Sequence, residues 1–362
     1  MKAPREPLHV LVVDDSAVVR QAMTMILESA AGARVTVAAD PLIAMRKMAQ
    51  SRPDVILLDL EMPRMDGLSF LRKLMAEDPI PVVVCSGLAG AGTQAALEAM
   101  EEGAVAVVAK PRLGIREFLE DSAILLEESL RGAAAARLLP SRPRRRVAAP
   151  ASRPPAPLAP RPRAVPQGGE RIVALAASTG GTEALRAILE ELPPDAPGTV
   201  IVQHMPEAFT RAFADRLNAG CRIEVKEAEY GDRVREGRAL IAPGNRHTSV
   251  ARDAAGFFVE VIDGPLVSRH RPSADVLFRS VAGAAGRQAV GAILTGMGAD
   301  GASGLLEMRR AGASTIAQDE ASSVVFGMPK EAIALGGVDE VLPLPAIAQA
   351  LLRLGRPAAG RA

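Results

Sequence analysis

A stretch rich in alanine, proline and arginine divides this chain into two parts and limits what either part can fold into. Nine prolines lie between Pro140 and Pro166, and residues 132–169 hold few large apolar side chains. Proline lacks a backbone N–H donor and favours extended conformations, and such a composition cannot build a hydrophobic core. We therefore predict a semi-rigid, extended linker over residues 132–169 that joins two folded units.

The charge of the chain is unevenly distributed. The formal net charge is +1, from 43 Lys and Arg residues against 42 Asp and Glu residues. Residues 137–169 contain eight arginines and no acid, so the rest of the chain has 35 basic residues against 42 acidic ones. A mildly acidic body with only 2 % aromatic residues is not typical of a nucleic-acid-binding protein. The basic linker could contact nucleic acid or act only as a soluble spacer; we favour the spacer and expect no nucleic-acid partner.

Cysteine content and hydropathy indicate the compartment. With only Cys85 and Cys221, the chain has neither a disulfide framework nor a cysteine-rich zinc site, which fits a reducing environment. The first apolar run, residues 8–13, stops at Asp14 and is too short for a signal peptide. No apolar stretch approaches the ~20 residues of a membrane span. We expect a cytoplasmic protein without direct membrane insertion.

Both parts of the chain alternate β-branched runs with helical patterns. Before the linker the runs are HVLVV, RVTVA, VILLD, PVVVC and AVAVV, which predicts a five-stranded parallel sheet covered by helices on both faces. After it they are RIVALA, TVIVQ, ALIAP, FFVEV, AVGAILT, STIAQ and VDEVLP, with helical stretches at 206–218, 272–285 and 302–311. We predict an α/β fold with units at residues 7–128 and 170–355. The second is doubly wound and mainly parallel, with some antiparallel pairing around residues 239–262.

Polar side chains fall at the ends of the strands predicted in the first unit. Asp14 and Asp15 follow the first strand, Asp59 ends the third, Ser86 follows the fourth and Lys110 the fifth. Ligands of parallel α/β sheets bind outside the carboxyl ends of the strands, and clustered carboxylates suit Mg²⁺. Ser86 and Lys110 could bind phosphate oxygens while Asp59 acts as a nucleophile that accepts a phosphoryl group. Each Asp alone could equally be a turn or helix cap; their joint placement points to a site.

The same segments resemble a known family. VLVVDDSAVVR, PDVILLDLEMPRMDGLSFLRKL, VVVCSG and GAVAVVAKP, within residues 8–128, are similar to the receiver domain of two-component response regulators. The resemblance implies a flavodoxin-like sheet of order 2-1-3-4-5, phosphorylation of Asp59, and phosphate-sensing roles for Ser86 and Lys110. It also implies Mg²⁺ held by Asp14, Asp15, Asp59 and the backbone carbonyl of Glu61. Val107 stands where receivers usually carry an aromatic switch residue, a departure that bears on an aromatic-rotamer relay and not on phosphorylation itself.

The second unit begins with a strand, a glycine-containing turn and a helix. In VALAASTGGTEALRAIL, Ser178 lies in the turn ahead of the helix, where unpaired backbone N–H groups could stabilise an oxyanion. Ser178 or Thr182 could instead be merely a helix N-cap, or the glycine turn could cradle a ligand phosphate. The motif does not decide between these, since it is neither G-x-S-x-G nor G-x-G-x-x-G.

A serine nucleophile needs a base, and the chain has four histidines. His9 lies in the first strand of the other unit, and we expect it to be structural. His204 follows TVIVQ and can emerge beside Ser178 in a parallel sheet, although a histidine there could also be only a satisfied polar residue. His247 and His270 lie on connections and are second choices.

The third member of a triad is an acid that fixes the imidazole tautomer. AVGAILTGMGADG places Asp300 after a strand and a glycine-rich turn, in which Met297 or a neighbour could supply an oxyanion N–H. Asp300 could instead only cap a helix over the Gly301 turn. Nucleophile, base and acid at three strand ends favour a serine hydrolase. Their order in the chain differs from that of α/β-hydrolases, so that fold is not implied.

Long segments of the second unit also resemble one family. AASTGGTEAL, VIVQHMPEAFTRAFADRLN, IAPGNRH, RHRPSADVLFRSVA, AILTGMGADGASGLLEMRRAGASTIAQDEASSVVFGMPKEAI and GGVDEVLPL are similar to the catalytic domain of chemotaxis protein-glutamate methylesterases, the CheB family, over residues 171–352. The resemblance implies Ser178 as nucleophile, His204 as general base and Asp300 as orienting acid. Thr179 and Met297 would lie beside the active site, with the Met297 N–H as an oxyanion donor.

With a receiver ahead of it, this resemblance implies an esterase activated by phosphorylation. Its substrates would be γ-glutamyl methyl esters on chemoreceptors, and a second activity would deamidate receptor glutamines. The unphosphorylated receiver would cover the catalytic face. The implied partners are methylated chemoreceptors as substrate and a cognate histidine kinase as phosphodonor. Phosphorylation would need Mg²⁺ and ester hydrolysis no cofactor, and we expect a monomer that serves adaptation in a chemosensory pathway.

Two other classes of function are weighed against this one. A non-enzymatic regulator would use the receiver to drive an interaction or DNA-binding output through the basic linker, but residues 171–352 show no helix-turn-helix pattern. A domain that binds receptors without catalysis is disfavoured, since all three triad positions hold residues competent for the chemistry.

Overall fold

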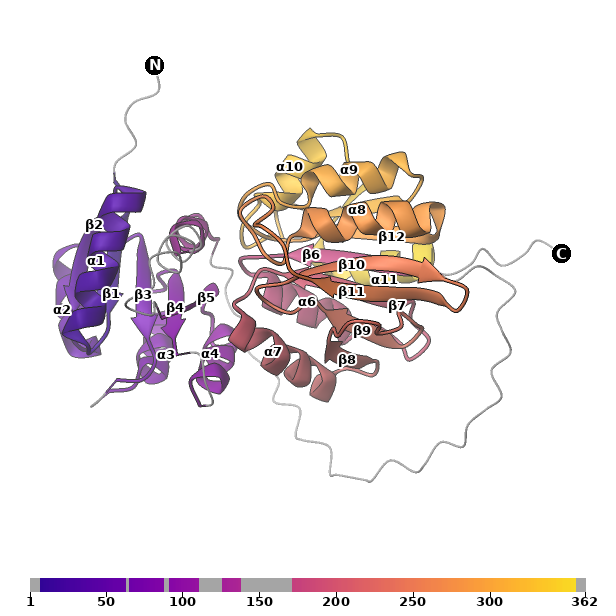
Figure 1. Ribbon diagram of the computed structural model, residues 1–362. Helices are drawn as coiled ribbons and strands as arrows, with labels where there is room; N and C mark the ends of the chain where they lie inside the picture. The colour runs from indigo at the N-terminus through magenta and orange to yellow at the C-terminus, as the bar shows by residue number, and fades with distance from the viewer. Residues whose placement is uncertain (1–6, 63–64, 88–90, 111–125, 138–170, 356–362) are drawn as a thin grey trace, which may run out of the picture.

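The computed structural model describes residues 7–62, 65–87, 91–110, 126–137 and 171–355. These residues form two α/β units that lie side by side (Figure 1). We call described residues 7–137 the N-terminal unit and residues 171–355 the C-terminal unit. Most of the predicted linker lies outside the described residues.

The N-terminal unit contains a five-stranded parallel sheet of order β2-β1-β3-β4-β5, which confirms the predicted topology. The five β-branched runs of the sequence are its strands: β1 (His9–Val13), β2 (Arg34–Ala38), β3 (Val55–Asp59), β4 (Val82–Ser86) and β5 (Ala106–Ala109). β1, β3 and β4 are buried throughout, as expected for a sheet covered on both faces.

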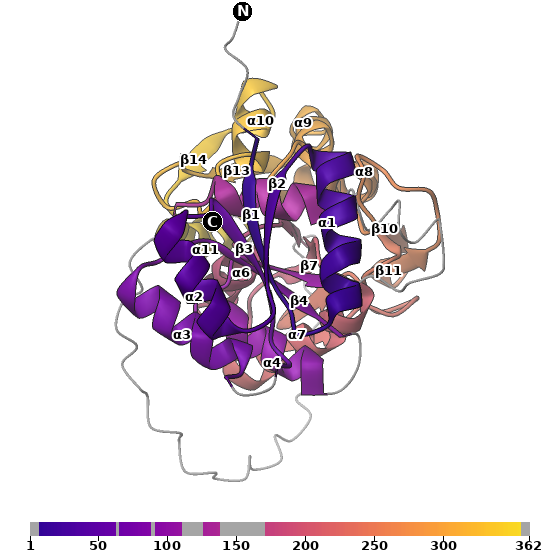
Figure 2. The same cartoon turned by 90° about the vertical axis from the view of Figure 1, so that its left-hand side faces the viewer.

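Helices cover both faces of this sheet (Figure 2). They are α1 (Ala17–Ala31), α2 (Pro41–Gln50), α3 (Gly67–Glu77), α4 (Ala91–Glu101) and a helix over residues 126–134. α1 and helix 126–134 share one apolar cluster with the sheet, and α2, α3 and α4 share the other. The side chains of Ser16, Asp40 and Asp66 cap α1, α2 and α3 by accepting from the backbone N–H three residues later.

Helix 126–134 crosses two boundaries predicted from the sequence. We placed the end of the first unit at residue 128 and the start of the linker at residue 132. However, Leu126, Leu130 and Ala133 are buried in the apolar cluster that contains β1, β3 and β4. The helix therefore covers the N-terminal sheet and extends into the first residues of the predicted linker.

The C-terminal unit is built on a seven-stranded parallel sheet of order β14-β13-β12-β6-β7-β9-β8. Its strands are β6 (Ile172–Ala177), β7 (Gly198–Gln203), β8 (Glu224–Glu227), β9 (Arg238–Ile241), β12 (Ala289–Ile293), β13 (Ser314–Gln318) and β14 (Glu340–Leu342). The chain winds from the central β6 outward in both directions, which confirms the doubly wound, mainly parallel architecture.

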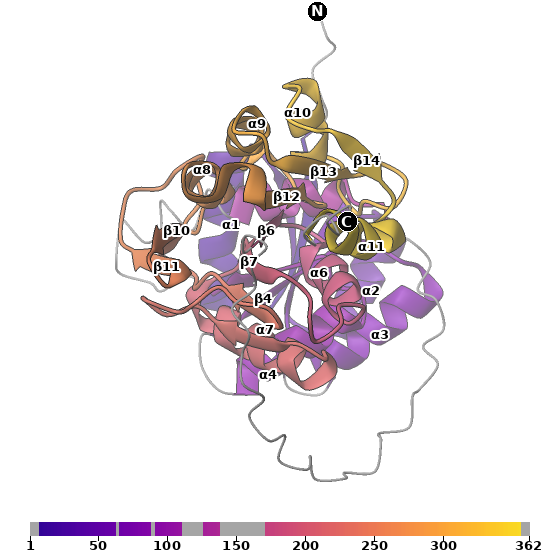
Figure 3. The ribbon, with the colours of Figure 1, turned by 90° about the vertical axis from the view of Figure 1, so that its right-hand side faces the viewer.

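Two layers of helices enclose this sheet (Figure 3). α6 (Gly181–Leu189), α7 (Glu207–Gly220) and α11 (Leu344–Gly355) pack on one face. α8 (Ala274–Ala285), followed by the short 3-10 helix η1 (Gly286–Gln288), packs on the other face with α9 (Ala302–Arg310) and α10 (Met328–Ala334).

Antiparallel pairing is confined to a separate two-stranded hairpin. β10 (His247–Asp253) pairs with β11 (Gly256–Ile262), within the region where we expected antiparallel strands. β9, in the same region, instead joins the parallel sheet. Neither β8 nor β10 was predicted, because their sequences EVKE and HTSVARD lack an apolar or β-branched run.

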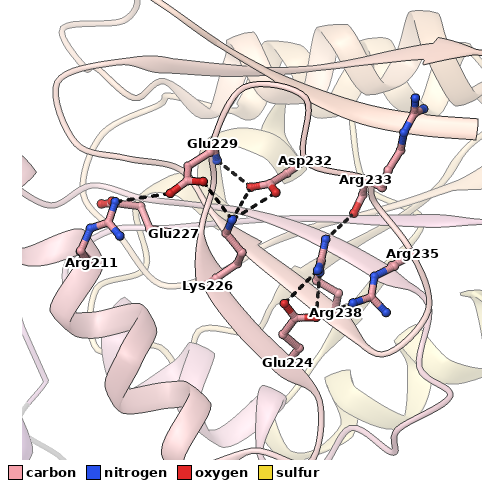
Figure 4. Close-up of polar contacts among 9 residues, drawn as sticks. All are labelled: Arg211, Glu224, Lys226, Glu227, Glu229, Asp232, Arg233, Arg235 and Arg238. Carbon is pink, nitrogen blue, oxygen red and sulfur yellow. Dashed lines mark hydrogen bonds and ion pairs between the residues drawn. The ribbon is translucent and has the colours of Figure 1, made fainter. Parts of the chain in front are cut away.

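The edge of the C-terminal sheet at β8 carries a network of charged side chains (Figure 4). Glu224 accepts from Arg235 and Arg238, at 2.6 and 2.9 Å. On the same strand, Lys226 pairs with Asp232 at 3.0 Å and Glu227 with Arg211 of α7 at 3.0 Å. The exposed edge of the sheet is thus lined with paired charges.

The two units contact each other through helices and loops. α4 of the N-terminal unit packs against α6 and α7, where Arg216 Nε donates to Glu101 Oε1 at 2.7 Å. The backbone N–H of Gly180, in the turn after β6, donates to the carbonyl of Val105 at 3.1 Å. The N-terminal unit therefore reaches the carboxyl edge of the C-terminal sheet.

Candidate functional site

Three neighbouring strands of the C-terminal sheet bring the predicted triad to one edge. Ser178 follows β6, His204 follows β7, and Asp300 lies in the turn between β12 and α9. β12 and β7 flank β6, so this is the point at which the strand order reverses. Such switch points are where open α/β sheets bind their ligands, outside the carboxyl ends of the strands.

Ser178 is held in a tight turn between β6 and α6. Its N–H donates to Thr295 at 3.0 Å, and its carbonyl accepts from Gln203 Nε2 at 2.9 Å. Gly180 has a φ of 76°, in the left-handed region that side chains other than glycine rarely adopt. A Cβ at Gly296 would lie 2.8 Å from the Ser178 Cβ. The loop after β12 therefore passes so close to Ser178 that only glycine fits at position 296.

His204 and Asp300 form a hydrogen-bonded pair. The Nε2 of His204 lies 2.8 Å from Asp300 Oδ2, and both side chains are almost fully buried. Burial lowers the pKa of His204, and the charge of His270 lowers it further, against the opposing effect of Asp300. Burial works against charge on Asp300 too, but its hydrogen bonds to His204 and Ser273 outweigh burial and lower the pKa of Asp300. The carboxylate form of Asp300 is thereby favoured.

The other ring nitrogen of His204 is not bound by Asp300. Within the part of the chain that the structure describes, the buried Nδ1 has no hydrogen-bond partner. No hydrogen bond therefore joins Ser178 to this nitrogen. Catalytic hydrogen bonds are often long or poorly aligned before substrate binds, so the roles of both residues stay predictions.

Asp300 is fixed by the beginning of α8 rather than by the helix that follows it. Ser273 Oγ donates to Asp300 Oδ1 at 2.6 Å, and the N–H groups of Ala274 and Asp275 donate at 2.7 and 3.2 Å. The alternative that Asp300 only caps the helix after Gly301 does not match this geometry, because α9 has Gly301 as N-cap with no side-chain cap. The carboxylate therefore caps α8 and binds His204 at the same time.

The remaining histidines have different surroundings. His9 is buried and lies within 3.1 Å of the Arg52 carbonyl and 2.9 Å of Thr36 Oγ1, which agrees with a structural role. His247 lies 2.8 Å from the Pro265 carbonyl. His270 stacks on His204, with ring centroids 3.7 Å apart and planes inclined by 12°.

From the sequence, His270 was only a second choice for the base, and Ser273 was not identified as part of this site. Both lie in the connection that leads into α8, and no motif in the sequence ties that connection to Ser178 or His204. The one signal in the sequence was the segment RHRPSADVLFRSVA, in which His270 shortly precedes Ser273 at the start of a helix.

The ligand atoms of His204, His270 and Asp300 lie within 4.8 Å of one another, a spacing that a metal ion could use. The stacked rings argue against such a site. A ring nitrogen binds a metal in the plane of its imidazole, and two nearly parallel planes 3.7 Å apart do not converge on one point. We assign no metal to this group.

Helix 126–134 lies over this edge of the C-terminal sheet. A Cβ at Gly132 would be 3.0 Å from Thr179 Oγ1 and 3.2 Å from Met297 Cβ. Both of these predicted active-site neighbours therefore face the helix. Oε2 of Glu128, on the same helix, lies 3.2 Å from Nε2 of His270. Burial opposes the negative charge of Glu128, but His270 and Arg269 outweigh burial and lower the pKa of Glu128.

The N-terminal unit brings its acidic residues together as predicted. Carboxylate oxygens of Asp14, Asp15 and Asp59 lie within 4.8 Å of one another. Lys110 Nζ is 2.7 Å from Asp59 Oδ2 and 3.3 Å from Asp14 Oδ2. Burial raises the pKa of Asp59, although Lys110 opposes this shift. A divalent cation would offset the unfavourable burial of the Asp59 charge. This set of hard oxygen donors fits Mg²⁺.

The other predicted residues of this unit lie around the acidic cluster. Ser86 is buried at the end of β4, and its carbonyl accepts from the Lys110 N–H at 3.0 Å. The Glu61 N–H donates to Asp59 Oδ1 at 3.1 Å, which places its peptide beside the phosphorylation candidate. Val107 is buried within β5 and pairs with Val84.

Among the described residues, no helix is both long and apolar enough to cross a membrane.

Comparison with protein families gives two matches. Residues 173–351 match the model of the CheB methylesterase family, and residues 10–121 match that of the response regulator receiver domain. Together the two matches cover both units of the chain.

Relatives and solved structures agree with these matches. The chain is 62 % identical to protein-glutamate methylesterase/protein-glutamine glutaminase 5 of Anaeromyxobacter dehalogenans, over 97 % of each chain. It is 57 % identical to protein-glutamate methylesterase/protein-glutamine glutaminase 3 of Geobacter metallireducens, over 96 % of this chain and 99 % of the relative. The crystal structure of the Thermotoga maritima CheB methylesterase catalytic domain aligns with a TM-score of 0.50 and 37 % identity, covering 51 % of this chain and 99 % of that domain.

Proposed function

Because the chain belongs to the CheB family of protein-glutamate methylesterases/protein-glutamine glutaminases with a response regulator receiver domain, we propose that it is a phosphorylation-activated serine esterase of a chemosensory pathway. Its substrates are γ-glutamyl methyl esters on chemoreceptors, and its products are glutamate and methanol. The observation that carries the proposal is the hydrogen-bonded pair of His204 and Asp300 at the switch point beside Ser178.

The proposed proton transfers use one particular nitrogen of His204. Since Asp300 binds Nε2 of His204, the proposed base is Nδ1, which has no hydrogen-bond partner among the described residues. Ser178 Oγ attacks the ester carbonyl while its proton passes to Nδ1, and Asp300 stabilises the imidazolium that results. The oxyanion accepts from backbone donors, with the Met297 N–H as candidate. Methanol leaves with the proton from Nδ1.

The second half of the cycle releases the acyl group from Ser178. Nδ1 of His204 takes a proton from water, the hydroxide attacks the acyl carbon, and Ser178 recovers its proton as glutamate departs. Deamidation of a receptor glutamine follows the same course, with ammonia in place of methanol as leaving group, so both activities share one set of residues.

Regulation uses the contact between the two units. Helix 126–134 lies against Thr179, Met297 and His270, so it would obstruct the approach of a receptor helix. We expect phosphorylation of Asp59 to rearrange the pair that it forms with Lys110 and to weaken this contact. Ser86 and Lys110 would contact the phosphoryl group.

The carboxylates of Asp14, Asp15 and Asp59, with the Glu61 carbonyl, would hold Mg²⁺. The ion would neutralise charge on the incoming phosphoryl group. A histidine kinase is the expected phosphodonor, and methylated chemoreceptors are the expected substrate. The esterase itself needs no cofactor in this scheme, and a single chain contains all of the residues it requires.

Methanol release from methylated receptor membranes tests the proposal. Wild-type protein should release methanol, more with a small-molecule phosphodonor and Mg²⁺, and Ser178→Ala should release none. Ser249→Ala is a suitable control, since Ser249 lies on the β10–β11 hairpin and its hydroxyl contacts only Glu260 among the described residues. If wild-type protein releases no methanol from freshly methylated receptors, the esterase proposal fails for those receptors.

A further inference from the structure

We propose that Glu128 is a positioning residue that keeps His270 protonated while the N-terminal unit covers the active site, and that the His270 cation, stacked on His204, weakens the catalytic base. The inference rests on the proposed function, because it concerns the base of the same reaction. It adds an electrostatic restraint to the obstruction that helix 126–134 already imposes.

The charge of His270 follows from the partners of its two ring nitrogens. Nδ1 lies 2.7 Å from the carbonyl oxygen of Ser268, and Nε2 lies 3.2 Å from Glu128 Oε2. A carbonyl and a carboxylate both accept hydrogen bonds and cannot donate them. Both contacts are satisfied only when each nitrogen carries a hydrogen, which is the imidazolium form.

The surroundings of His270 agree with this assignment. The side chain is 8 % exposed, and burial works against its charge. The hydrogen bond and charge of Glu128, with a smaller contribution from Asp300, outweigh burial and raise the pKa of His270. Arg269 lies 3.5 Å from Glu128 Oε1 and competes for the carboxylate, but its side chain is largely exposed.

The stacked cation acts directly on His204. During the reaction Nδ1 of His204 must take the proton of Ser178, which would place two cations face to face at a centroid distance of 3.7 Å. Asp300, at 2.8 Å from His204, offsets part of this repulsion, and Glu128 a smaller part. Burial, the largest contribution, and the His270 cation together outweigh these carboxylates and lower the pKa of His204, so His204 is a weaker base in this arrangement.

Removing Glu128 would reverse the effect. Glu128 belongs to helix 126–134, so separation of the units takes its carboxylate away from His270. An imidazolium that loses its paired anion is destabilised and gives up its proton more readily. His204 then faces a neutral ring and retains Asp300, so its basicity rises. Opening of the units would thus improve both access and the chemistry.

The experiment is a pH-rate profile of kcat/KM for the unphosphorylated full-length protein, acting on a short peptide that contains glutamate γ-methyl ester. Glu128→Gln removes the charge and keeps the shape. We expect its acid limb to move to higher pH and its plateau rate to rise roughly threefold or more, because a stronger base speeds proton transfer. A phosphodonor should move the wild-type profile in the same direction.

Glu101→Gln is the matched control. It weakens the pair with Arg216 at the contact between α4 and α7 without touching either histidine. Loosening of the interface opens only a fraction of the molecules, so it should move the acid limb less than Glu128→Gln, which removes the carboxylate from every molecule. If Glu128→Gln and Glu101→Gln give parallel increases with unshifted limbs, Glu128 acts only by obstruction and the proposal is overturned.

A second readout does not depend on turnover. In a Ser178→Ala background, NMR titration of histidine ring nitrogens should show a lower pKa for His270 when Glu128 is replaced by Gln. An unchanged His270 titration would also overturn the proposal. By contrast, peptide hydrolysis that survives Ser178→Ala would refute the proposed esterase mechanism itself, so the two failures are distinguishable.

Discussion

Replacing Asp300 by Asn tests the electrostatic part of the proposed mechanism. The carboxylate accepts from His204 and Ala274 on Oδ2, and from Ser273 and Asp275 on Oδ1. An Asn amide satisfies most of these donors if its oxygen takes the Oδ2 position. Its NH2 group can then donate to the Ser273 hydroxyl, and only the Asp275 N–H loses its acceptor. In this orientation the tautomer of His204 is kept and the negative charge is lost.

The size of the effect follows from the distance between the two groups. Unit charges 2.8 Å apart attract by about 6 kcal/mol at an effective dielectric constant of about 20. Asn retains a neutral hydrogen bond, so we expect a net loss of about 3–5 kcal/mol of stabilisation for the His204 imidazolium. That corresponds to a rate of methanol release lower by a factor of about 10² to 10⁴.

The pH dependence gives the sign of the effect independently. Asp300 raises the pKa of His204, so Asn at position 300 should lower that pKa further and move the acid limb of kcat/KM to lower pH. The assay is methanol release from methylated receptors between pH 5 and 9, with Asp339→Asn as control. Asp339 binds Thr315 at the opposite end of β13 and should leave the rate unchanged. A loss below tenfold in a protein that still unfolds cooperatively would refute the reasoning.

Three further predictions concern the surroundings of Asp300 and the acidic cluster of the N-terminal unit. Ser273→Ala removes the 2.6 Å hydrogen bond to Asp300, so we expect hydrolysis to fall roughly tenfold and thermal unfolding to show a loss of about 1–2 kcal/mol; an unchanged rate would mean that the α8 N–H groups hold Asp300 unaided. Asp59→Asn should abolish stimulation by a phosphodonor, measured as methanol release, and leave basal hydrolysis intact. Full stimulation of that variant would show that Asp59 is not the switch. Chelation of Mg²⁺ should abolish the stimulation of methanol release by a phosphodonor and leave basal release unchanged. A loss of basal release on chelation would contradict an esterase that needs no cofactor.

Regular strands and helices were predictable because burial on both faces of a parallel sheet demands continuous apolar runs. Every such run identified in the sequence overlaps a strand, from β1 to β14. β8 was missed for the opposite reason. This strand lies at the edge of the sheet, and only Val225 of its sequence EVKE is buried. Its other side chains are charged and partly exposed, so the segment does not resemble a buried strand.

The polar residues of the site were predictable in part. Strand ends identify Ser178, His204 and Asp300, because parallel strands deliver their last residues to one edge. The contribution of His270 depends on the conformation of a connection, in which Ser268 and Arg269 have positive φ angles of 51° and 67°. The contact between Glu128 and His270 depends on how two units pack, which no local pattern encodes.

The charged side chains at the β8 edge of the C-terminal sheet oppose self-association through that edge. An exposed edge strand offers unpaired backbone groups to any other strand, including β8 of a second copy. Two copies joined edge to edge would bring Glu224 and Lys226 of each chain close to their counterparts and strip water from ion pairs that are now solvated. Desolvation of such pairs costs several kcal/mol per ion, so extension of the seven-stranded sheet by a second copy is opposed at this edge.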